Sequence, residues 1–461
     1  MRLKALFSAQ DMTKGPPYAR ILEFAFPMLL GNIAQQLYNT ADSIIVGHYL
    51  GDNALSAVGS AGPVINLLLA LLVGIGSGAG IVVSQSYGAK NREALTANVG
   101  NSIALGGLAS LVLTVAGTLA AMPMLRFLGT PESIIDWSAS YLQIFFLGIL
   151  GFCMYNMLSG IMRGLGDSLS ALGFLLIAAV LNIFLDLLFV AKYHMGVSGV
   201  ALATVLAQSI SAVLCYWRLL HMRDVFDLNF STIRVHKDIS KKIIRMGIPT
   251  GISQMLIATS TMAAQNLINS MGEMVIACNV IIMRVDGFAM MPNFTYGTTM
   301  GVFAGQNVGA QKFDRLHHGV RQGMFISVST AVVVTLIITT WGHVLFGFFT
   351  ETEELIDLAV RMMRILAIGY IAMSVSQIMS GTMRGAGDTV SPMCVSFITT
   401  LVLRIPSAYI LAYFSRTPEW PHGQPYTLFL SLMFAWVMGA VITGLLFKFG
   451  PWKKKMHVRS Y

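Results

Sequence analysis

Two aspartates stand inside long apolar stretches, where an ionisable side chain is costly and is by default a functional hypothesis. Asp42 occurs in QQLYNTADSIIVG, and Asp186 occurs in LNIFLDLLF four residues after Asn182. Because residues three or four apart share a helical face, Asp186 and Asn182 are expected to meet. The residues that share a face with Asp42 by the same rule are Gln35, Tyr38 and Asn39. Carboxylate and amide oxygens suit a hard cation or a proton, while the competing interpretation is satisfied polar packing between helices.

A third acid, Asp286, lies in the apolar stretch IMRVDGFAMM. It is two residues from Arg284, so the two side chains cannot share a helical face. We expect it to form a structural or gating bridge with an arginine, and the candidates are Arg404, Arg361 and Arg364. Met283 stands nearby, and flexible methionines suit promiscuous ligands. Met283 and Asp286 are therefore candidate substrate-facing residues, with core or lipid-facing packing as the alternative for the methionine.

The elements that position these residues follow from the composition. Of 461 residues, 55% are hydrophobic and only 11% are charged, against roughly 25% charged in soluble domains. Lipid must therefore surround most of the chain, and long apolar blocks favour helices over the short alternating segments of a β-barrel. The sequence predicts twelve transmembrane helices, at 20–44, 53–84, 95–122, 134–160, 168–191, 197–220, 242–268, 275–304, 318–348, 355–381, 389–414 and 427–449.

The distribution of Lys and Arg predicts the orientation, because cytoplasmic loops hold the excess of both. With the N-terminus inside, 23 of the 30 basic residues fall on the cytoplasmic side and three on the other side. Both termini are therefore expected in the cytoplasm. The net charge of +9 is explained by this topology, and a nucleic-acid partner is not expected, since no basic face of a soluble domain is present.

The chain contains an internal repeat. SGIMRGLGDS (159–168) returns as SGTMRGAGDT (380–389), and SQSYGAKNREAL (84–95) matches GQNVGAQKFDRL (305–316), both 221 residues apart. The sequence thus predicts an all-α polytopic protein of two pseudo-symmetric six-helix bundles, at 1–235 and 236–461. An even number of spans in each half makes the halves parallel repeats, as in transporters that rock one half against the other.

The MRGxGD motif falls on the cytoplasmic side after the fourth span of each half. Its glycines permit a tight turn, while its Arg and Asp can pair with one another or cap the next helix. We interpret the motif as a hinge, with the candidate hinge residues Arg163, Asp167, Arg384 and Asp388. The repeat is not symmetric in its acids, because the counterparts of Asp42 and Asp186 are Ala264 and Ser407. That asymmetry argues against a purely structural role for the two aspartates.

These motifs resemble those of the MATE (multidrug and toxic compound extrusion) transporters. The matching features are Pro27 and Pro249 near the start of spans one and seven, QxxGA after spans two and eight, and SGxMRGxGD after spans four and ten. The resemblance covers nearly the whole chain. It implies two six-helix bundles in a V-shape around a central cavity, and cation-coupled export.

The resemblance is to the prokaryotic DinF-like branch, in which acids of spans one and five form a cation site with polar residues of spans four and six. Carried over to this sequence, the implied site is Asp42, Asn156, Asn182, Asp186 and Thr204, with Tyr141 as a hydrogen-bond partner of Asp42. The NorM-like branch instead uses acids in spans eight and ten. The stretch LAIGYIAMSVSQIMSG (366–381) of span ten contains no acid, which argues against a second cation site.

The expected function is an antiporter in which inward Na⁺ or H⁺ drives efflux of amphipathic, mostly cationic, organic compounds. No enzyme motif is present, and no cofactor or metal is expected beyond a Na⁺ ion at the coupling site. The chain is expected to act as a monomer in the cytoplasmic (inner) membrane of a bacterium or archaeon. The alternatives are a lipid-linked saccharide flippase, which would need a cavity rich in Arg and Lys, and a non-transporting membrane scaffold.

Overall fold

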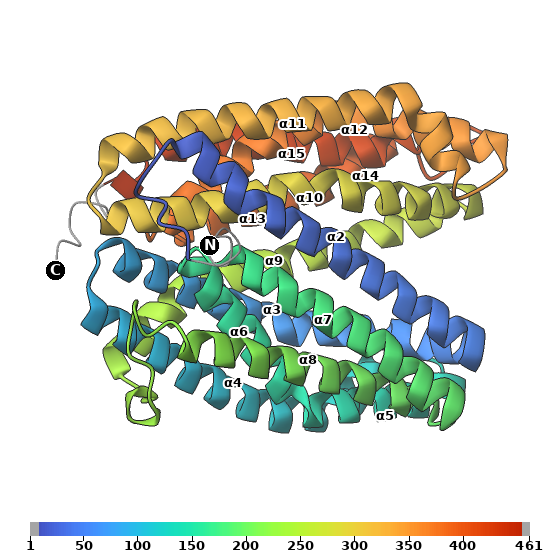
Figure 1. Ribbon diagram of the computed structural model, residues 1–461. Helices are drawn as coiled ribbons and strands as arrows, with labels where there is room; N and C mark the ends of the chain where they lie inside the picture. The colour runs from blue at the N-terminus through green and yellow to red at the C-terminus, as the bar shows by residue number, and fades with distance from the viewer. Residues whose placement is uncertain (1–8, 454–461) are drawn as a thin grey trace. The chain divides into compact units, whose positions relative to one another are not determined.

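The computed structural model describes residues 9–453, and the regular structure in this range is entirely helical (Figure 1). The first half contains α2 (Pro17–Leu50), α3 (Asp52–Gly88), α4 (Arg92–Phe127), α5 (Glu132–Leu147), α6 (Ile149–Gly164), α7 (Ser168–Asp186), the π-helix η1 (Leu187–Lys192), α8 (Gly196–Leu220) and the 3-10 helix η2 (Phe230–Thr232). The second half contains α9 (Lys237–Ser270), α10 (Glu273–Gly309), α11 (Phe313–Gly347), α12 (Glu353–Gly385), α13 (Val390–Phe397), the π-helix η3 (Ile398–Arg404), α14 (Ile405–Phe414) and α15 (Tyr426–Phe449).

Each of the twelve predicted spans lies on these helices. Within residues 9–453, nine helices are long and apolar enough to cross a membrane, and the pair α5–α6 makes a tenth if it counts as one span. That pair is bent by 54°, so the unbroken span predicted at 134–160 is corrected to two helices that meet at Gly148. α2 and α9 are helices of 34 residues whose apolar runs are interrupted by polar side chains.

The chain folds into two compact units. Among the described residues, the first comprises 9–12 and Glu23–Gly251, and the second comprises Thr13–Leu22 and 252–453. In the first unit α3, α4, α6 and α8 pack together, and in the second unit α10, α11, α12 and α15 do so (Figure 1). Along the chain, the boundary between the units falls once inside α2 and once inside α9. The predicted boundary at 235 and 236 instead lies just before α9.

Glycine contacts repeat the same helix pairing in both units. In the first unit, a Cβ atom placed on Gly80 of α3 would lie 2.8 Å from the carbonyl oxygen of Gly160 in α6. In the second unit, Gly301 of α10 faces Gly381 of α12, where the same distance is 3.5 Å, and both residues are 221 positions further along the chain. Small residues let helix backbones approach closely in a membrane. Gly160 and Gly381, two residues before MRG in each copy, therefore lie where two helices pack against one another.

The tight turn within each MRGxGD motif depends on a different glycine from the one in the helix contact. Gly166 has φ +90° and Gly387 has φ +92°, a left-handed conformation that side chains with a Cβ atom rarely adopt. This confirms the tight turn predicted from MRGxGD and assigns it to the last glycine of each copy.

Candidate cation site

The first unit brings together the two aspartates that the sequence singled out. The carboxyl groups of Asp42 in α2 and Asp186 at the end of α7 lie within hydrogen-bond reach of one another. Asp186 has 0% of its surface exposed. Within residues 9–453, the buried Oδ1 atom of each aspartate has no hydrogen-bond partner. Two carboxylates this close repel one another when both are ionised, so a proton or a cation between them is strongly favoured.

Asn182 and Thr204 complete one side of this pair. In the orientation that satisfies both ends of its amide, Asn182 donates to Asp186 Oδ2 at 2.8 Å and accepts from the backbone N–H of Thr204 at 3.2 Å. The side chain of Asn182 has no exposed surface. It is therefore fixed between α7 and α8 and holds the Asp186 carboxylate in one orientation.

Two tyrosines lie on the other side. Tyr38, one helical turn before Asp42 in α2, has its hydroxyl close to the Thr204 side chain. Tyr141 of α5 is 7% exposed and lies within electrostatic range of Asp42, Tyr38 and Asp186. Its ring stacks on Phe145 at 6.5 Å between centroids. The site thus combines two carboxylates, one amide and three hydroxyl groups, which are oxygen ligands for a hard cation or carriers for a proton.

The π-helix η1 begins directly after Asp186. π-helical turns are rare and occur frequently at functional sites. The widened turn changes the direction in which the following side chains point, and it places Asp186 at the boundary between two helical geometries.

Three other predicted residues have different partners. Asn156 donates from Nδ2 to the carbonyl of Phe152 at 2.9 Å in its own helix, and Gln35 donates to Asn39 Oδ1 at 3.2 Å. Within the described chain, none of Asn156, Gln35 and Asn39 bonds to either aspartate. The structure therefore brings Asp42, Asp186, Asn182, Thr204, Tyr38 and Tyr141 together and leaves these three outside the group.

Asp286 has a partner that sequence analysis missed. It accepts a hydrogen bond from Tyr370 Oη of α12 at 2.8 Å. Arg404 lies within electrostatic range but donates to Ser260 Oγ at 3.3 Å. Residues 9–453 contain no ion pair of Asp286 with any arginine, so the predicted bridge to Arg404, Arg361 or Arg364 is wrong as a direct contact.

The internal repeat did not point to Tyr370 as a polar position, because the equivalent residue in the first half is the apolar Ile149. Met283, also a candidate, is 50% exposed, and its sulfur accepts from Asn279 at 3.5 Å.

The Arg and Asp side chains of the MRGxGD motifs do not pair with one another. Asp167 caps α7 by accepting from the Ser170 N–H at 3.0 Å, and its other oxygen pairs with Arg218 at 3.1 Å. Arg163 donates instead to Ser159 Oγ at 2.8 Å. The capping alternative thus holds, and the Arg–Asp pair within the motif does not form.

In the second copy, Asp388 accepts from the Ser391 hydroxyl at 2.7 Å. The side chain of Arg384 forms no hydrogen bond or ion pair within residues 9–453, while its carbonyl accepts from the Gly387 N–H at 2.9 Å.

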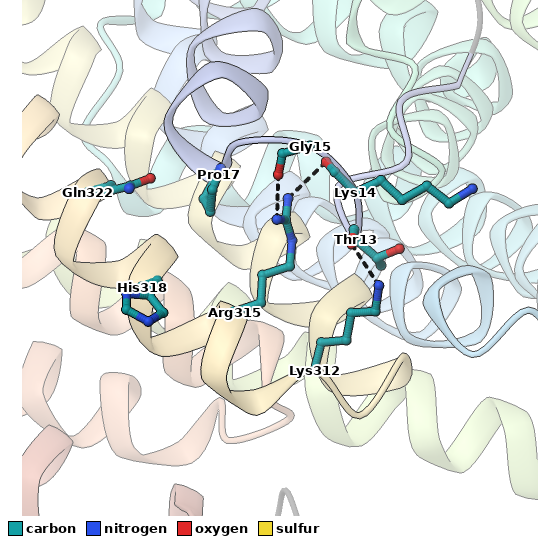
Figure 2. Close-up of a pocket in the computed structure, with 8 residues that line it drawn as sticks. All are labelled: Thr13, Lys14, Gly15, Pro17, Lys312, Arg315, His318 and Gln322. Atoms are coloured by element: carbon teal, nitrogen blue, oxygen red, sulfur yellow. Dashed lines mark hydrogen bonds between the residues drawn. The ribbon is translucent and has the colours of Figure 1, made fainter.

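A basic cluster in the second unit was not predicted. Figure 2 shows Lys312 and Arg315, at the start of α11, directed at backbone carbonyls of residues 13–15. Lys312 Nζ donates to the Thr13 carbonyl at 3.0 Å, and Arg315 donates to the Lys14 carbonyl at 2.9 Å. The residues that form these bonds line a cavity of about 670 Å³. They fix the segment that leads into α2.

This fold, with long apolar helices in two units and a buried carboxylate pair in one of them, is that of a multi-pass membrane transporter. The sequence profile of the MatE family matches residues 27–188 and, 222 positions further on, residues 249–410. The chain therefore belongs to the MatE family, which confirms the resemblance to MATE transporters.

Relatives of known name support the same family. The probable multidrug resistance protein YoeA of Bacillus subtilis (strain 168) is 29% identical, over 98% of this chain and 97% of its own length. The probable multidrug resistance protein NorM of Thermotoga maritima is 26% identical, over 94% and 93%. A crystal structure of MATE in the bent conformation superposes with a TM-score of 0.89 at 22% identity, over 97% of this chain and 98% of that one. This last similarity shows the fold.

Proposed function

We propose that this chain is a multidrug exporter driven by inward movement of Na⁺ or H⁺. The export of drugs is supported by the names of its relatives, two of which are probable multidrug resistance proteins. The coupling is supported by one observation, the contact between Asp42 and Asp186 in a buried site where no basic side chain of residues 9–453 contacts either carboxyl group.

The geometry explains how an ion would act there. Loading of one positive charge relieves the repulsion between the carboxylates and lets α2 and α7 remain in contact. Loss of that charge makes the contact unfavourable and drives the two helices apart. A site that changes its preferred helix packing when the ion binds can couple an ion gradient to a conformational change, because the ion then binds one state more tightly than the other.

The proposed substrates are amphipathic organic compounds, most of them cationic. In this proposal the chain is a monomer in a cytoplasmic membrane, with both termini in the cytoplasm. No ATP-binding motif was found in the sequence, so the gradient supplies the work.

The test is efflux of a fluorescent organic cation from proteoliposomes, with the Na⁺ and pH gradients imposed separately. Asp42→Asn and Asp186→Asn should each reduce gradient-driven efflux by at least about tenfold, since one neutralised carboxylate leaves too little charge to hold the ion. Asp286→Asn is the matched control, because it neutralises an intramembrane acid that already has a tyrosine donor. Full coupled efflux by both first-unit variants would overturn the proposal.

A further inference from the structure

One face of α10 remains open in the second unit. Most side chains of α10 in residues 275–300 are buried or half-buried, and the exposed ones recur on a single helical face. They are Val280, Met283, Arg284, Phe288, Phe294 and Thr298. The face is apolar and aromatic, with one guanidinium group on it.

Arg284 lies deep in the span. α10 has 37 residues and is therefore about 55 Å long, against about 30 Å for the hydrocarbon core. Arg284 is seven residues from the middle residue, Met291, or about 10 Å along the axis. A helix centred on the bilayer would thus hold Arg284 within the hydrocarbon region.

Nothing in the described chain neutralises this guanidinium. Within residues 9–453, the side chain of Arg284 forms no hydrogen bond or ion pair. Asp286, two residues further on, lies on another side of the helix and accepts from Tyr370. The repeat counterpart of Arg284 in the first half is Pro63, so the positive charge belongs to the second unit alone.

An exposed, unpartnered arginine at this depth does not face acyl chains, because that placement costs several kcal/mol. The open face of α10 therefore borders water or a transported compound. We propose that Arg284 binds an anionic group, a carboxylate, of the exported compounds. The inference rests on the proposed export function. It specifies that some of the amphipathic, cationic compounds exported also carry a carboxylate group.

The neighbouring side chains fit such a compound. A guanidinium binds a carboxylate through two parallel N–H donors, which gives both strength and orientation. Met283 and Phe288, exposed by 50% and 46%, offer polarizable and aromatic contact to a ring system. A substrate with a ring system, a cationic centre and a carboxylate would use all of these groups.

The test is export of two fluorescent xanthene dyes, one with a free carboxylate and the other its methyl ester, by reconstituted protein. Wild type should prefer the acid by about tenfold, the scale of one charge-assisted hydrogen bond. Arg284→Gln should lose this preference and still export the ester. Arg284→Lys should retain part of this preference, because lysine keeps the positive charge but lacks the two parallel N–H donors of the guanidinium group. Arg361→Gln, at an exposed arginine of α12 that also has no partner in the described chain, should behave as wild type.

The outcomes separate the two claims. An unchanged ratio of acid to ester in Arg284→Gln overturns the role of Arg284 and leaves the export function intact. Failure of wild type to export either dye under any gradient counts against the export function itself. Export of the ester by Arg284→Gln shows that the variant is folded, so a lost preference cannot be attributed to misfolding.

Discussion

Replacement of Gly160 by alanine tests the close contact between α3 and α6. A Cβ atom on Gly160 would lie 2.6 Å from the carbonyl oxygen of Gly76, about 0.8 Å closer than the 3.4 Å at which ordinary contact begins. That oxygen belongs to the helix backbone and cannot rotate away, so the helices must separate. Overpacking of this kind costs about 1–3 kcal/mol, offset by about 1 kcal/mol of helix propensity. We expect a net loss of up to about 2 kcal/mol and, since the unfolding entropy of a chain of 461 residues is about 1 kcal/mol/K, a midpoint of unfolding lower by up to about 2 °C.

The assay is thermal unfolding in detergent, and the chain offers matched controls. At Gly173 in α7 no described atom lies within 4 Å of an added Cβ, so Gly173→Ala should leave the midpoint unchanged or raise it. Gly381→Ala, the repeat counterpart of Gly160, meets the Gly297 carbonyl more closely still and should lower the midpoint by at least as much. Equal midpoints for Gly160→Ala and Gly173→Ala would refute the packing argument.

Two further substitutions probe single contacts. The bidentate hydrogen bond from Arg92 lowers the pKa of Asp227, so its stabilisation is complete above the ordinary aspartate pKa and fades as the pH falls through the lowered value. The difference in unfolding midpoint between wild type and Asp227→Asn should therefore shrink below about pH 4, and a constant difference would contradict this. Tyr370→Phe removes the donor to Asp286 and should cost about 1–3 kcal/mol in unfolding experiments. Tyr296→Phe, which removes a neutral bond of 3.3 Å to Thr330, should cost less, and the reverse order would contradict the assignment.

The sequence predicted the fold to a large extent, because hydropathy at the length of a membrane span leaves few alternatives to a helix. All twelve predicted segments are helical. The break at Gly148 was missed, although a tertiary contact requires glycine there: Val205 of α8 occupies the space that a side chain would need. Local sequence gives no signal of that approach.

The candidate site was predicted in part. Asp42 and Asp186 stood out because charge is rare at membrane depth, and the structure brings them together. Asn156 is equally polar, yet its amide donates to the carbonyl of Phe152. A helical side chain always has such a local partner four residues back, so residue type alone does not tell which polar groups face a site. Tyr370 was missed because the contact joins two helices far apart in the sequence.

The two units share their helix pairing and differ in their buried charge. The glycine contacts between α3 and α6 return between α10 and α12 at the same offset, so the backbone of the repeat is preserved. In the first unit, two carboxylates meet without a positive side chain in contact. In the second, Asp286 has a tyrosine donor and Arg404 within electrostatic range. A single carboxylate with a hydroxyl donor and a nearby guanidinium gains less from an added cation than a pair of carboxylates does. The electrostatics therefore favour the first unit as the place where an ion is bound and released, and Arg284 leaves the second unit the better suited to an anionic group of the cargo.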